Sequence, residues 1–471
     1  MKITFYGGAG GVTGSKHLLE VRKRKILLDC GTWQGSGEAR RKNRSFSFQP
    51  EAIDQVVLSH AHIDHCGMLP LLIKHGFKGS IFATAATKDV ARLMLGDMAK
   101  IEWQDARYRQ RHKLGTPDER LPLFDESDVE EVISRFVEVP YVRHSEEWHE
   151  VMEGVKLKLY DAGHILGSAI CVLEFEEKGG GGFKRVAFSG DVGQPGLPLL
   201  FDPQVPEEEI ETLLLESTYG SRVHESQEGA EERLVENITA VLNRGGKMIV
   251  PAFSLGRTQG IVYLLHKLTD QGRLPRFPIY VDSPLAANLT DVYRRHRREY
   301  DEESWTDFKD PGDRPLAFRN LRYTQSAEES KQLNEKRGPF MVIAASGMMS
   351  YGRVVHHLRQ HVGNEKNAIF ITGYQAQETM GRSILEGERR IRIFGDWLPV
   401  KAQVFLFNEL SAHADRNQLQ AYAERINGLQ NVFLVHGEPH QADDLKGQLL
   451  KAHPEWRVER PEEGDVFEVL K

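Results

Sequence analysis

The chain has 471 residues, of which 40% are hydrophobic and 27% are charged, and its 61 Lys and Arg against 68 Asp and Glu give a net charge of −7. This composition is ordinary for a globular protein with a large core, and it excludes collagen-like, coiled-coil and wholly disordered chains. At about 150 residues per domain, the length predicts two or three domains. No apolar run approaches the roughly 18 residues of a membrane-spanning helix, so we expect no membrane partner.

The expected compartment follows from the first residues and from the cysteines. Residues 1–8 contain no long apolar stretch before a small-residue cleavage site, so a secretory signal is not expected. Three cysteines cannot build a disulfide framework, which favours a reducing compartment. We therefore expect a cytoplasmic protein. The unusual count is 19 His, and the prediction of function depends on where they fall.

Short β-branched runs alternate with helical patterns along the chain, which predicts an α/β fold. Residues 97–150 interrupt this alternation with a helical, charge-rich segment. Six predicted strands are followed closely by His, Asp or Glu, and these strands span residues 54–59, 155–160, 185–189, 212–215, 403–407 and 431–435. Ligands bind beyond the carboxyl ends of strands in α/β folds, whereas ordinary turns favour Gly, Asn, Asp and Ser. The pattern predicts a functional site at one sheet edge.

The segment His60-Ala61-His62-Ile63-Asp64-His65 is the strongest functional signal in the sequence. His60 and His62 are two residues apart at the end of an extended segment, so they project to the same side. Asp64 and His65 follow where the chain turns into a helix. Imidazole and carboxylate ligands suit Zn²⁺ better than Fe or Mn. The residues that would complete two metal sites are His164, Asp191 and His436.

A pair of metals at this position would make the protein a hydrolase. Two cations about 3.5–4 Å apart share a water, lower its pKa toward about 7 and stabilise in-line attack on phosphorus or a carbonyl carbon. Asp191 is the residue that could bridge both ions. The prediction is therefore two Zn²⁺ per chain and a metal-bridged hydroxide as the nucleophile. A solvated polar loop is the alternative for the 60–65 cluster, and for each isolated ligand it is a strong one.

The motifs resemble those of the metallo-β-lactamase superfamily. HAHIDH (60–65) is similar to its HxHxDH signature, and GHILGS (163–168), SGDVG (189–193) and LVHGEP (434–439) match its later motifs in order. Asp29 matches the first motif, whose aspartate supports the ligating histidines in this family. The resemblance implies a four-layer αββα sandwich with a dinuclear site at the edge of its two sheets.

The long segment before His436 looks like a β-CASP domain, the cap of nucleic-acid-processing members. Glu216 in ESTYG, His413 in SAHAD and His436 match its motifs A, B and C, and PAFSLGRTQ (251–259), DSPLA (282–286), ASGMMSYGR (345–353) and GYQAQETMGR (373–382) are also similar. A His at motif C resembles the RNA-processing branch, including the mRNA 3′-end endonuclease and its bacterial and archaeal relatives. The implied division is 1–212 and 396–471 for the metallo-β-lactamase domain and 213–395 for the β-CASP domain.

The resemblance implies a zinc-dependent ribonuclease that cleaves single-stranded RNA endonucleolytically. His413 is the expected general acid, with Glu216 holding its ring and raising its pKa, and Asp64 acts with the metals. Backbone N–H groups of a loop and three arginines are candidates for binding substrate phosphates: Ser346, Gly347, Met348, Arg257, Arg353 and Arg382. For the arginines a solvated surface role is an equal alternative.

Several functions stay open at this stage. A 5′-exoribonuclease of the same family is one, and a DNA-directed β-CASP nuclease, which His436 disfavours, is another. A small-molecule metallo-hydrolase would have no use for the cap, and a pseudonuclease would lack ligands that this chain retains. RNA is the expected partner, and a homodimer is open because relatives often dimerise. The net charge of −7 predicts that RNA binding away from the site is weak and salt-sensitive.

Overall fold

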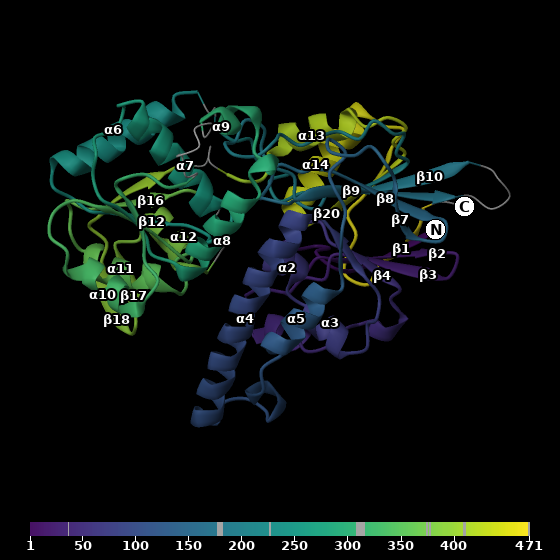
Figure 1. Cartoon of the computed structure of the whole chain (residues 1–471), viewed down its shortest axis with the longest axis horizontal. Helices are drawn as coiled ribbons and strands as arrows, with labels where there is room; N and C mark the ends of the chain where they lie inside the picture. Colours follow the sequence, from purple (N-terminus) through teal and green to yellow (C-terminus); the bar gives the residue numbers. More distant parts are fainter. Residues whose placement is uncertain are drawn as a thin grey trace. The chain divides into compact units, whose positions relative to one another are not determined.

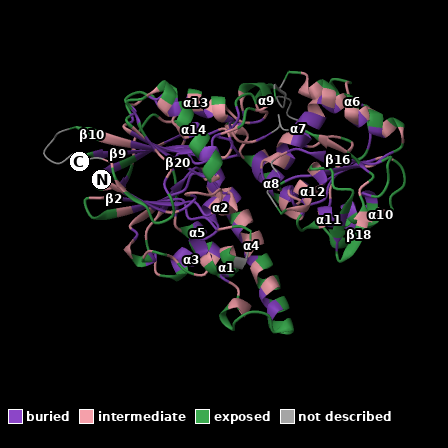
Figure 2. Cartoon of the chain, turned by 180° about the vertical axis from the view of Figure 1, so that it is seen from behind, coloured by how far each residue is buried: buried purple, intermediate pink, exposed green. Residues whose placement is uncertain are grey.

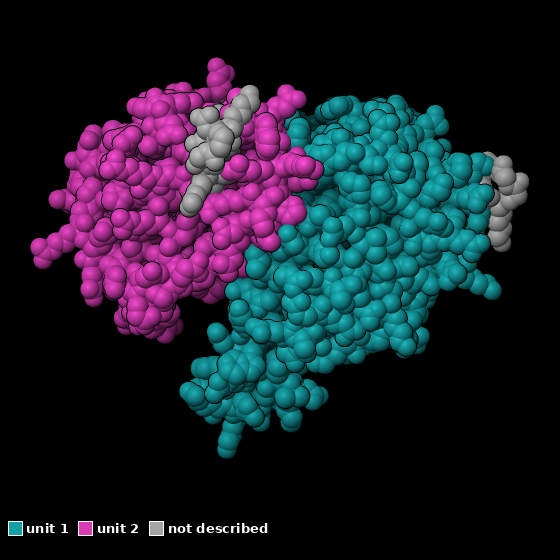
Figure 3. Space-filling model, in the orientation of Figure 1, with its two compact units in different colours: residues 1–195, 201–223, 413–471 teal, residues 196–200, 224–412 magenta. Residues whose placement is uncertain are grey.

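A computed structural model describes residues 1–35, 37–176, 182–225, 228–307, 316–373, 375, 378–407 and 411–469. The chain forms two compact units (Figure 3). Unit 1 comprises Met1–Pro195, Phe201–Val223 and His413–Lys471, and unit 2 comprises Gly196–Leu200 and His224–Ala412. Residues 396–412 group with unit 2 because strand β19 (Gln403–Leu406) pairs with β16 (Ala368–Ile371) of that unit. The division of the chain into named domains at 212/213 and 395/396 stays a prediction.

Unit 1 contains two mixed sheets (Figure 1). Within the described residues the first has the order β22-β1-β2-β3-β4-β5-β6, antiparallel from β22 to β3 and parallel from β3 to β6. Its strands are β1 (Lys2–Gly7), β2 (Lys16–Val21), β3 (Arg24–Leu28), β4 (Gln55–Val57), β5 (Ile81–Ala83), β6 (Phe136–Glu138) and β22 (Val466–Glu468). The parallel strands β3 and β4 therefore end at the same edge of the sheet.

The second sheet has the order β21-β20-β11-β10-β9-β8-β7, parallel from β21 to β10 and antiparallel from β10 to β7. Its strands are β7 (His149–Met152), β8 (Val155–Asp161), β9 (Ala169–Glu176), β10 (Phe183–Phe188), β11 (Thr212–Glu216), β20 (Asn431–Val435) and β21 (Arg457–Glu459). Because β8 and β10 are both antiparallel to β9, the strands β8, β10, β11 and β20 all end at one edge. The run Gly179 to Gly182 predicts a flexible hairpin tip between two strands, but residues 179–181 lie outside the part of the chain that the structure describes.

The two sheets pack face to face, and helices cover their outer faces (Figure 2). Phe5 and Leu28 of the first sheet share one core with Leu173, Phe188 and Phe433 of the second. A second core joins the outer face of the second sheet to helices α13 (Arg416–Glu424) and α14 (Pro439–Ala452). Helices α3, α4 and α5 lie on the side of the first sheet (Figure 1). The α/β prediction is confirmed, and the layer order is the expected αββα.

The helices of unit 1 begin at recognisable caps. Thr84 accepts a hydrogen bond from the backbone N–H of Thr87 at the start of α4, and Asp125 forms a capping box with Asp128 at the start of α5. Besides α13 and α14, the helices described in this unit are α1 (Gly37–Lys42), η1 (Pro50–Ala52), α2 (Ile63–Cys66), α3 (Leu69–Lys74), α4 (Ala85–His112), η2 (Asp118–Arg120) and α5 (Glu126–Ser134). In the segment 97–150, predicted as helical, the end of α4, η2 and α5 are helical, whereas β6 and the start of β7 are strands.

Unit 2 is built on a six-stranded parallel sheet, counted in the described residues, of order β14-β13-β15-β12-β16-β19. The further strands are β12 (Met248–Pro251), β13 (Ile279–Val281), β14 (Leu321–Tyr323), β15 (Met341–Ala344) and the hairpin β17 (Arg390–Ile393) and β18 (Asp396–Pro399). The helices are α6 (Ala230–Asn243), α7 (Arg257–Asp270), α8 (Pro284–Arg295), η3 (Arg297–Glu299), α9 (Glu302–Asp307), α10 (Ala327–Glu335), α11 (Arg353–His361) and α12 (Met380–Leu385). Among the described residues, none of the helices in either unit combines the length and apolar character needed to cross a bilayer.

Candidate metal centre

The carboxyl ends of four strands in unit 1 bring the predicted ligands together. β4 runs into His60 and His62, and His62 is the N-cap of α2, which carries Asp64 and His65. In the second sheet His164 follows β8, Asp191 follows β10, and His436 follows β20 with φ of 48°. The strand directions explain this convergence. β8, β10 and β20 all end at the same edge of the second sheet, and the loops that follow these strands and β4 carry the ligands.

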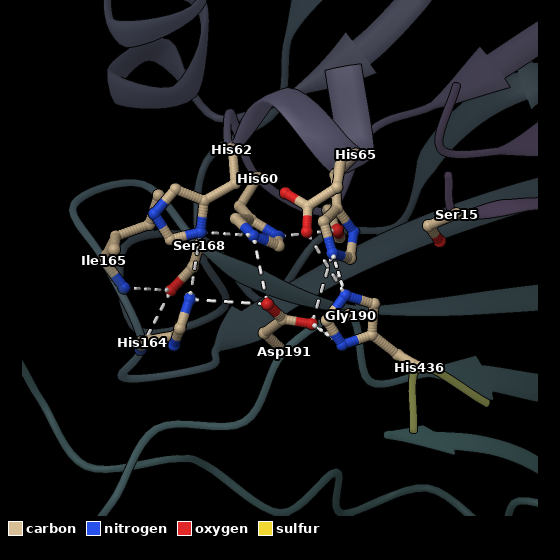
Figure 4. Close-up of polar contacts among 12 residues, drawn as sticks. Ser15, His60, His62, His65, His164, Ile165, Ser168, Gly190, Asp191 and His436 are labelled. Carbon is tan, nitrogen blue, oxygen red and sulfur yellow. Dashed lines mark hydrogen bonds and ion pairs between the residues drawn. The ribbon is translucent and has the colours of Figure 1, made fainter. Parts of the chain in front are cut away.

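The first group of ligand atoms comes from His60, His62, His164 and Asp191, and these atoms lie within 4.8 Å of one another. His62 Nδ1 is 3.1 Å from His60 Nε2 and 3.2 Å from His164 Nε2. Asp191 Oδ2 is 3.4 Å from both His60 Nε2 and His164 Nε2. Figure 4 shows the three rings and the carboxylate turned toward a common point.

The second group consists of Asp64, His65 and His436. His65 Nε2 is 3.1 Å from His436 Nε2, which is 3.6 Å from Asp64 Oδ2. The other oxygen of Asp191, Oδ1, is 3.3 Å from His65 Nε2 and 3.3 Å from His436 Nδ1 (Figure 4). One carboxylate thus faces both groups, with one oxygen turned to each.

The donor set fits divalent zinc. Tetrahedral Zn²⁺ with Zn–N distances of about 2.0–2.1 Å holds its ligand atoms about 3.3–3.4 Å apart, close to the separations within each group. Burial lowers the pKa of His60 to about 3 and of His62 to about 4, so both rings are neutral, as metal ligation requires. Asp191 Oδ1 is buried and accepts no hydrogen bond from any described residue. A cation between the groups would satisfy this oxygen.

Two residues behind the ligands fix the orientation of the imidazoles. Asp29 Oδ2 is 2.6 Å from His65 Nδ1, so the opposite ring nitrogen points into the site. The same carboxylate accepts hydrogen bonds from the backbone N–H and the hydroxyl of Ser59, at 2.8 and 2.9 Å. The Ser59 hydroxyl in turn is 3.0 Å from His60 Nδ1. Asp29 therefore lies where the sequence placed it, whereas Ser59 was not predicted.

Other supporting contacts come from residues to which the sequence assigned no role of their own. Ser168 Oγ accepts hydrogen bonds from the backbone N–H groups of His164 and Ile165, at 3.1 and 3.2 Å. Thr218 Oγ1 donates to the carbonyl of His436 at 3.0 Å, and the His436 N–H donates to the carbonyl of Gly8 at 2.6 Å. The glycine-rich segment 7–14 lies between the paired strands β1 and β2, and through Gly8 it also holds the loop that carries His436.

His413 and Glu216 form a pair beside the first group of ligands. His413 Nδ1 is 3.0 Å from Glu216 Oε1, and Glu216 also accepts backbone hydrogen bonds from Val192 and Thr218. The His413 ring lies 4.5 Å, centroid to centroid, from the ring of His164. Burial lowers the pKa of His413, but the charge and hydrogen bond of Glu216 outweigh this effect and raise the pKa to about 9. The raised pKa favours the protonated form of the ring at neutral pH.

Comparison with known proteins identifies the family of the chain. A metallo-beta-lactamase superfamily domain matches residues 18–178, a Beta-Casp domain matches 258–384, and a Zn-dependent metallo-hydrolase RNA specificity domain matches 397–461. Ribonuclease TTHA0252 of Thermus thermophilus is 36% identical over 450 residues, which cover 96% of each chain. The chain belongs to the β-CASP family of the metallo-β-lactamase superfamily. As a member of this family it is a metal-dependent hydrolase.

Further β-CASP relatives match over most of the chain. The RNase J-like protein of Methanocaldococcus jannaschii is 29% identical and is covered over 93% of both chains. Transcription termination factor FttA of the same organism is 28% identical over 94% of this chain and 68% of its own length. A crystal structure of a protein of unknown function from Enterococcus faecalis V583 is 12% identical and superposes with a TM-score of 0.52 over 99% of both chains, which shows a shared fold.

The predicted phosphate-binding residues all lie in unit 2. Ser346, Gly347 and Met348 form the loop after β15, and the buried hydroxyl of Ser346 has no hydrogen-bond partner among the described residues. Arg353 donates to Asp282 Oδ1 at 2.7 Å, and Arg382 donates to Glu386 at 2.6 Å. Both guanidinium groups are thus engaged by carboxylates within the unit. Arg257 is the first residue of α7. In the motif 373–382, which contains Arg382, the residues Tyr374, Ala376 and Gln377 lie outside the described residues.

Proposed function

We propose that this β-CASP protein is a zinc-dependent ribonuclease that hydrolyses phosphodiester bonds of RNA with two Zn²⁺ per chain. The observation that carries the proposal is one carboxylate, Asp191, between two groups of metal-ligating atoms, beside a protonated His413. The match to an RNA specificity domain and the ribonuclease relatives support RNA as the substrate.

Phosphodiester hydrolysis needs a nucleophile, stabilisation of the charge on phosphorus and a proton for the leaving oxygen. Bound metals would supply a water of lowered pKa and would offset the developing negative charge. His413 donates the proton from Nε2, because Glu216 holds Nδ1 and keeps the ring charged. Asp29 and Ser59 keep His65 and His60 in the tautomer that ligates through Nε2.

The finer part of the proposal concerns how the RNA is cut. We infer endonucleolytic cleavage of single-stranded RNA that leaves the phosphate on the 5′ side of the downstream fragment. The loop at Ser346, Gly347 and Met348 is a candidate to bind a neighbouring phosphate, since a buried hydroxyl without a partner is available there. Arg257 is a further candidate at the start of α7, while Arg353 and Arg382 would first have to leave their carboxylate partners.

The test uses the full chain loaded with Zn²⁺ and matched substrates labelled at the 5′ or 3′ end. Single-stranded RNA should be cleaved much faster than DNA of the same sequence, and the internal products should carry a 5′ phosphate. Equal cleavage of DNA would contradict the proposal. A covalently closed circular RNA separates the two modes, because only an endonuclease can cut it. An intact circle with degraded linear RNA would indicate the 5′-exoribonuclease instead.

A further inference from the structure

The outer half of α4 is a helix face that the metal centre does not use. In its first half the helix buries Ala86, Val90, Ala91, Leu95 and Ala99 against unit 1, whereas in its last twelve residues only Ala106 and Arg109 are buried. Figures 1 and 2 both show this half extending away from the sheets, and Figure 2 shows exposed residues along it. We define the α4 outer face as Lys100, Trp103, Arg107, Tyr108, Arg111 and Lys113.

Positive charge is concentrated on this face. Lys100, Arg107 and Arg111 follow each other at helical spacings of seven and four, so they form one exposed stripe, and Lys113 caps it. None of the four forms an ion pair with any residue that the structure describes. The carboxylates of this half turn elsewhere, since Asp105 binds Arg109 and Glu102 accepts from the backbone of Leu123. In a chain of net charge −7, this separation of charge is distinctive.

Two aromatic rings stand exposed among these cations. Trp103 is 52% exposed and Tyr108 is 57% exposed. The Arg107 guanidinium lies 4.5 Å from the centroid of the Trp103 ring, and Tyr108 lies 4.4 Å from the ring of His112. A surface on which cations alternate with exposed aromatic rings suits single-stranded nucleic acid, because phosphates pair with the cations and bases stack on the rings.

The inner end of the same helix is attached to a ligand-bearing loop of the metal centre. The hydroxyls of Thr84 and Thr87 both donate to the carbonyl of Gly167, at 2.8 and 2.7 Å. Gly167 lies three residues after His164 in the same loop. At about 1.5 Å per residue, the outer face begins about 20 Å along the helix from this attachment and ends about 40 Å along it. An RNA bound at both the metal centre and the α4 outer face must therefore extend well beyond the scissile bond.

We propose that the α4 outer face binds a segment of the RNA substrate that extends beyond the metal centre. The proposal rests on the ribonuclease function proposed above and adds a second contact for the same substrate. Charge complementarity decides the occupant: the face presents four cations, the carboxylates of Glu102 and Asp105 are engaged by other residues, and RNA is a polyanion with stackable bases. An RNA too short to reach the face gains nothing from it.

The experiment compares the KM of wild-type and variant chains over single-stranded RNAs from about 5 to about 40 nucleotides. The variants are Lys100→Ala/Arg107→Ala/Arg111→Ala for charge and Trp103→Ala/Tyr108→Ala for stacking. For long RNA the charge variant should raise KM about tenfold and lower the slope of log KM against log salt by about 2, at about 0.7 per phosphate contact. The stacking variant should raise KM by a similar factor without changing the slope. For the shortest RNA both variants should match wild type.

A matched control removes the same charge elsewhere in unit 1, with Lys78→Ala/Lys156→Ala/Lys451→Ala at exposed positions, and should leave KM unchanged. Unchanged KM and salt slope of the charge variant on long RNA would overturn the proposal, as would a change in oligomeric mass without a change in RNA binding. Anisotropy titration of long RNA in a His413→Ala background separates the two proposals. If the charge variant binds long RNA more weakly in this titration, the RNA-binding role of the α4 outer face is supported even when no RNA is cleaved. If the wild-type chain fails to cleave RNA, only the proposed ribonuclease function is contradicted.

Discussion

Asp191 is the residue on which the arrangement of both ligand groups depends. Each of its oxygens faces a different group, and burial of the carboxylate is offset by the surrounding histidines, which hold its pKa well below the usual range. A carboxylate in this position can contact two cations at once and hold them about 3.5–4 Å apart. Shortening or neutralising it would affect both metal sites together, whereas each of the other ligands belongs to one group.

Asp29 should control metal affinity without touching the metal. Asp29→Asn keeps the volume of the side chain but removes the charge that holds His65 Nδ1–H at 2.6 Å. Losing such a partner typically weakens metal binding by about 10–100-fold. Competition with a chromophoric zinc chelator measures this change. Ser59→Ala is the milder control, because the backbone N–H of Ser59 still donates to Asp29. Wild-type affinity in Asp29→Asn would show that the contact does not orient His65.

His413→Ala separates proton donation from metal binding. The variant should retain its zinc and lose about 10²–10⁴-fold of its rate on RNA, because the 3′ oxygen of the upstream fragment then departs without a proton. On a phosphodiester with a nitrophenolate leaving group, which needs no proton, the variant should lose much less. Rates on both substrates and zinc content per chain are the measurements. Equal losses on the two substrates would remove His413 as the acid.

Candidate ligands could be predicted from the sequence, and the structure brings them together, because their motifs are local and their chemistry is restrictive. His60 to His65 lie in one short segment, and only a few metals suit imidazole with carboxylate. The supporting contacts were not predictable in the same way. Thr218 and Gly8 reach His436 across more than two hundred residues of chain, and such pairs follow from the tertiary fold alone. The same is true of the partner that engages Arg353, since Asp282 lies on another strand end.

At the scale of elements, the loop after β3 holds α2 in place. Backbone hydrogen bonds join Cys30 to His65 and Thr32 to Ile63, at 2.7 and 3.0 Å. Gly31 lies between them so close to α2 that a Cβ atom would be 1.6 Å from the carbonyl oxygen of Asp64. The glycine is therefore required where loop and helix meet, and the position of two ligands depends on it.

Gly31→Ala should move α2 and lower both stability and metal retention. Overpacking of this kind costs about 1–3 kcal/mol in the free energy of unfolding, and the displaced Asp64 and His65 should bind metal more weakly. Chemical denaturation of the chelated chain gives the first quantity, and zinc content after dialysis gives the second. Gly11→Ala is the matched control, since a Cβ there meets nothing within 4 Å. Wild-type values for Gly31→Ala would show that α2 is not fixed by this contact.

Element prediction was most accurate where a buried strand runs directly into a functional residue. The strand 431–435 was predicted with the bounds that the structure gives, because the four consecutive apolar residues Val432 to Val435 precede His436-Gly437. β19 was also expected at its position, but its sheet was not evident from the sequence. It pairs with β16 of unit 2, and a strand's partner depends on which neighbouring edge is open rather than on its own residues.

At the scale of the whole molecule, all predicted metal ligands lie in unit 1. Metal binding should therefore stabilise unit 1 selectively, because a ligand that binds only the folded state adds its binding free energy to the unit that holds it. Chelation should lower amide protection in β10 and β20 and leave β12 and β15 of unit 2 unchanged. Hydrogen exchange with mass spectrometry resolves these peptides. Equal loss of protection in both units would indicate metals bound elsewhere or a single cooperative unit.

The central claim is that RNA cleavage requires two zinc ions bound around Asp191. The most direct measurement is the rate of cleavage of single-stranded RNA as zinc is added back to the chelated chain, with bound zinc determined in the same samples. The rate should stay low through the first equivalent and reach its maximum at two bound ions per chain, and Asp191→Asn should fail to reach it. Full activity at one ion per chain, or activity that persists in the chelated chain, would contradict the account.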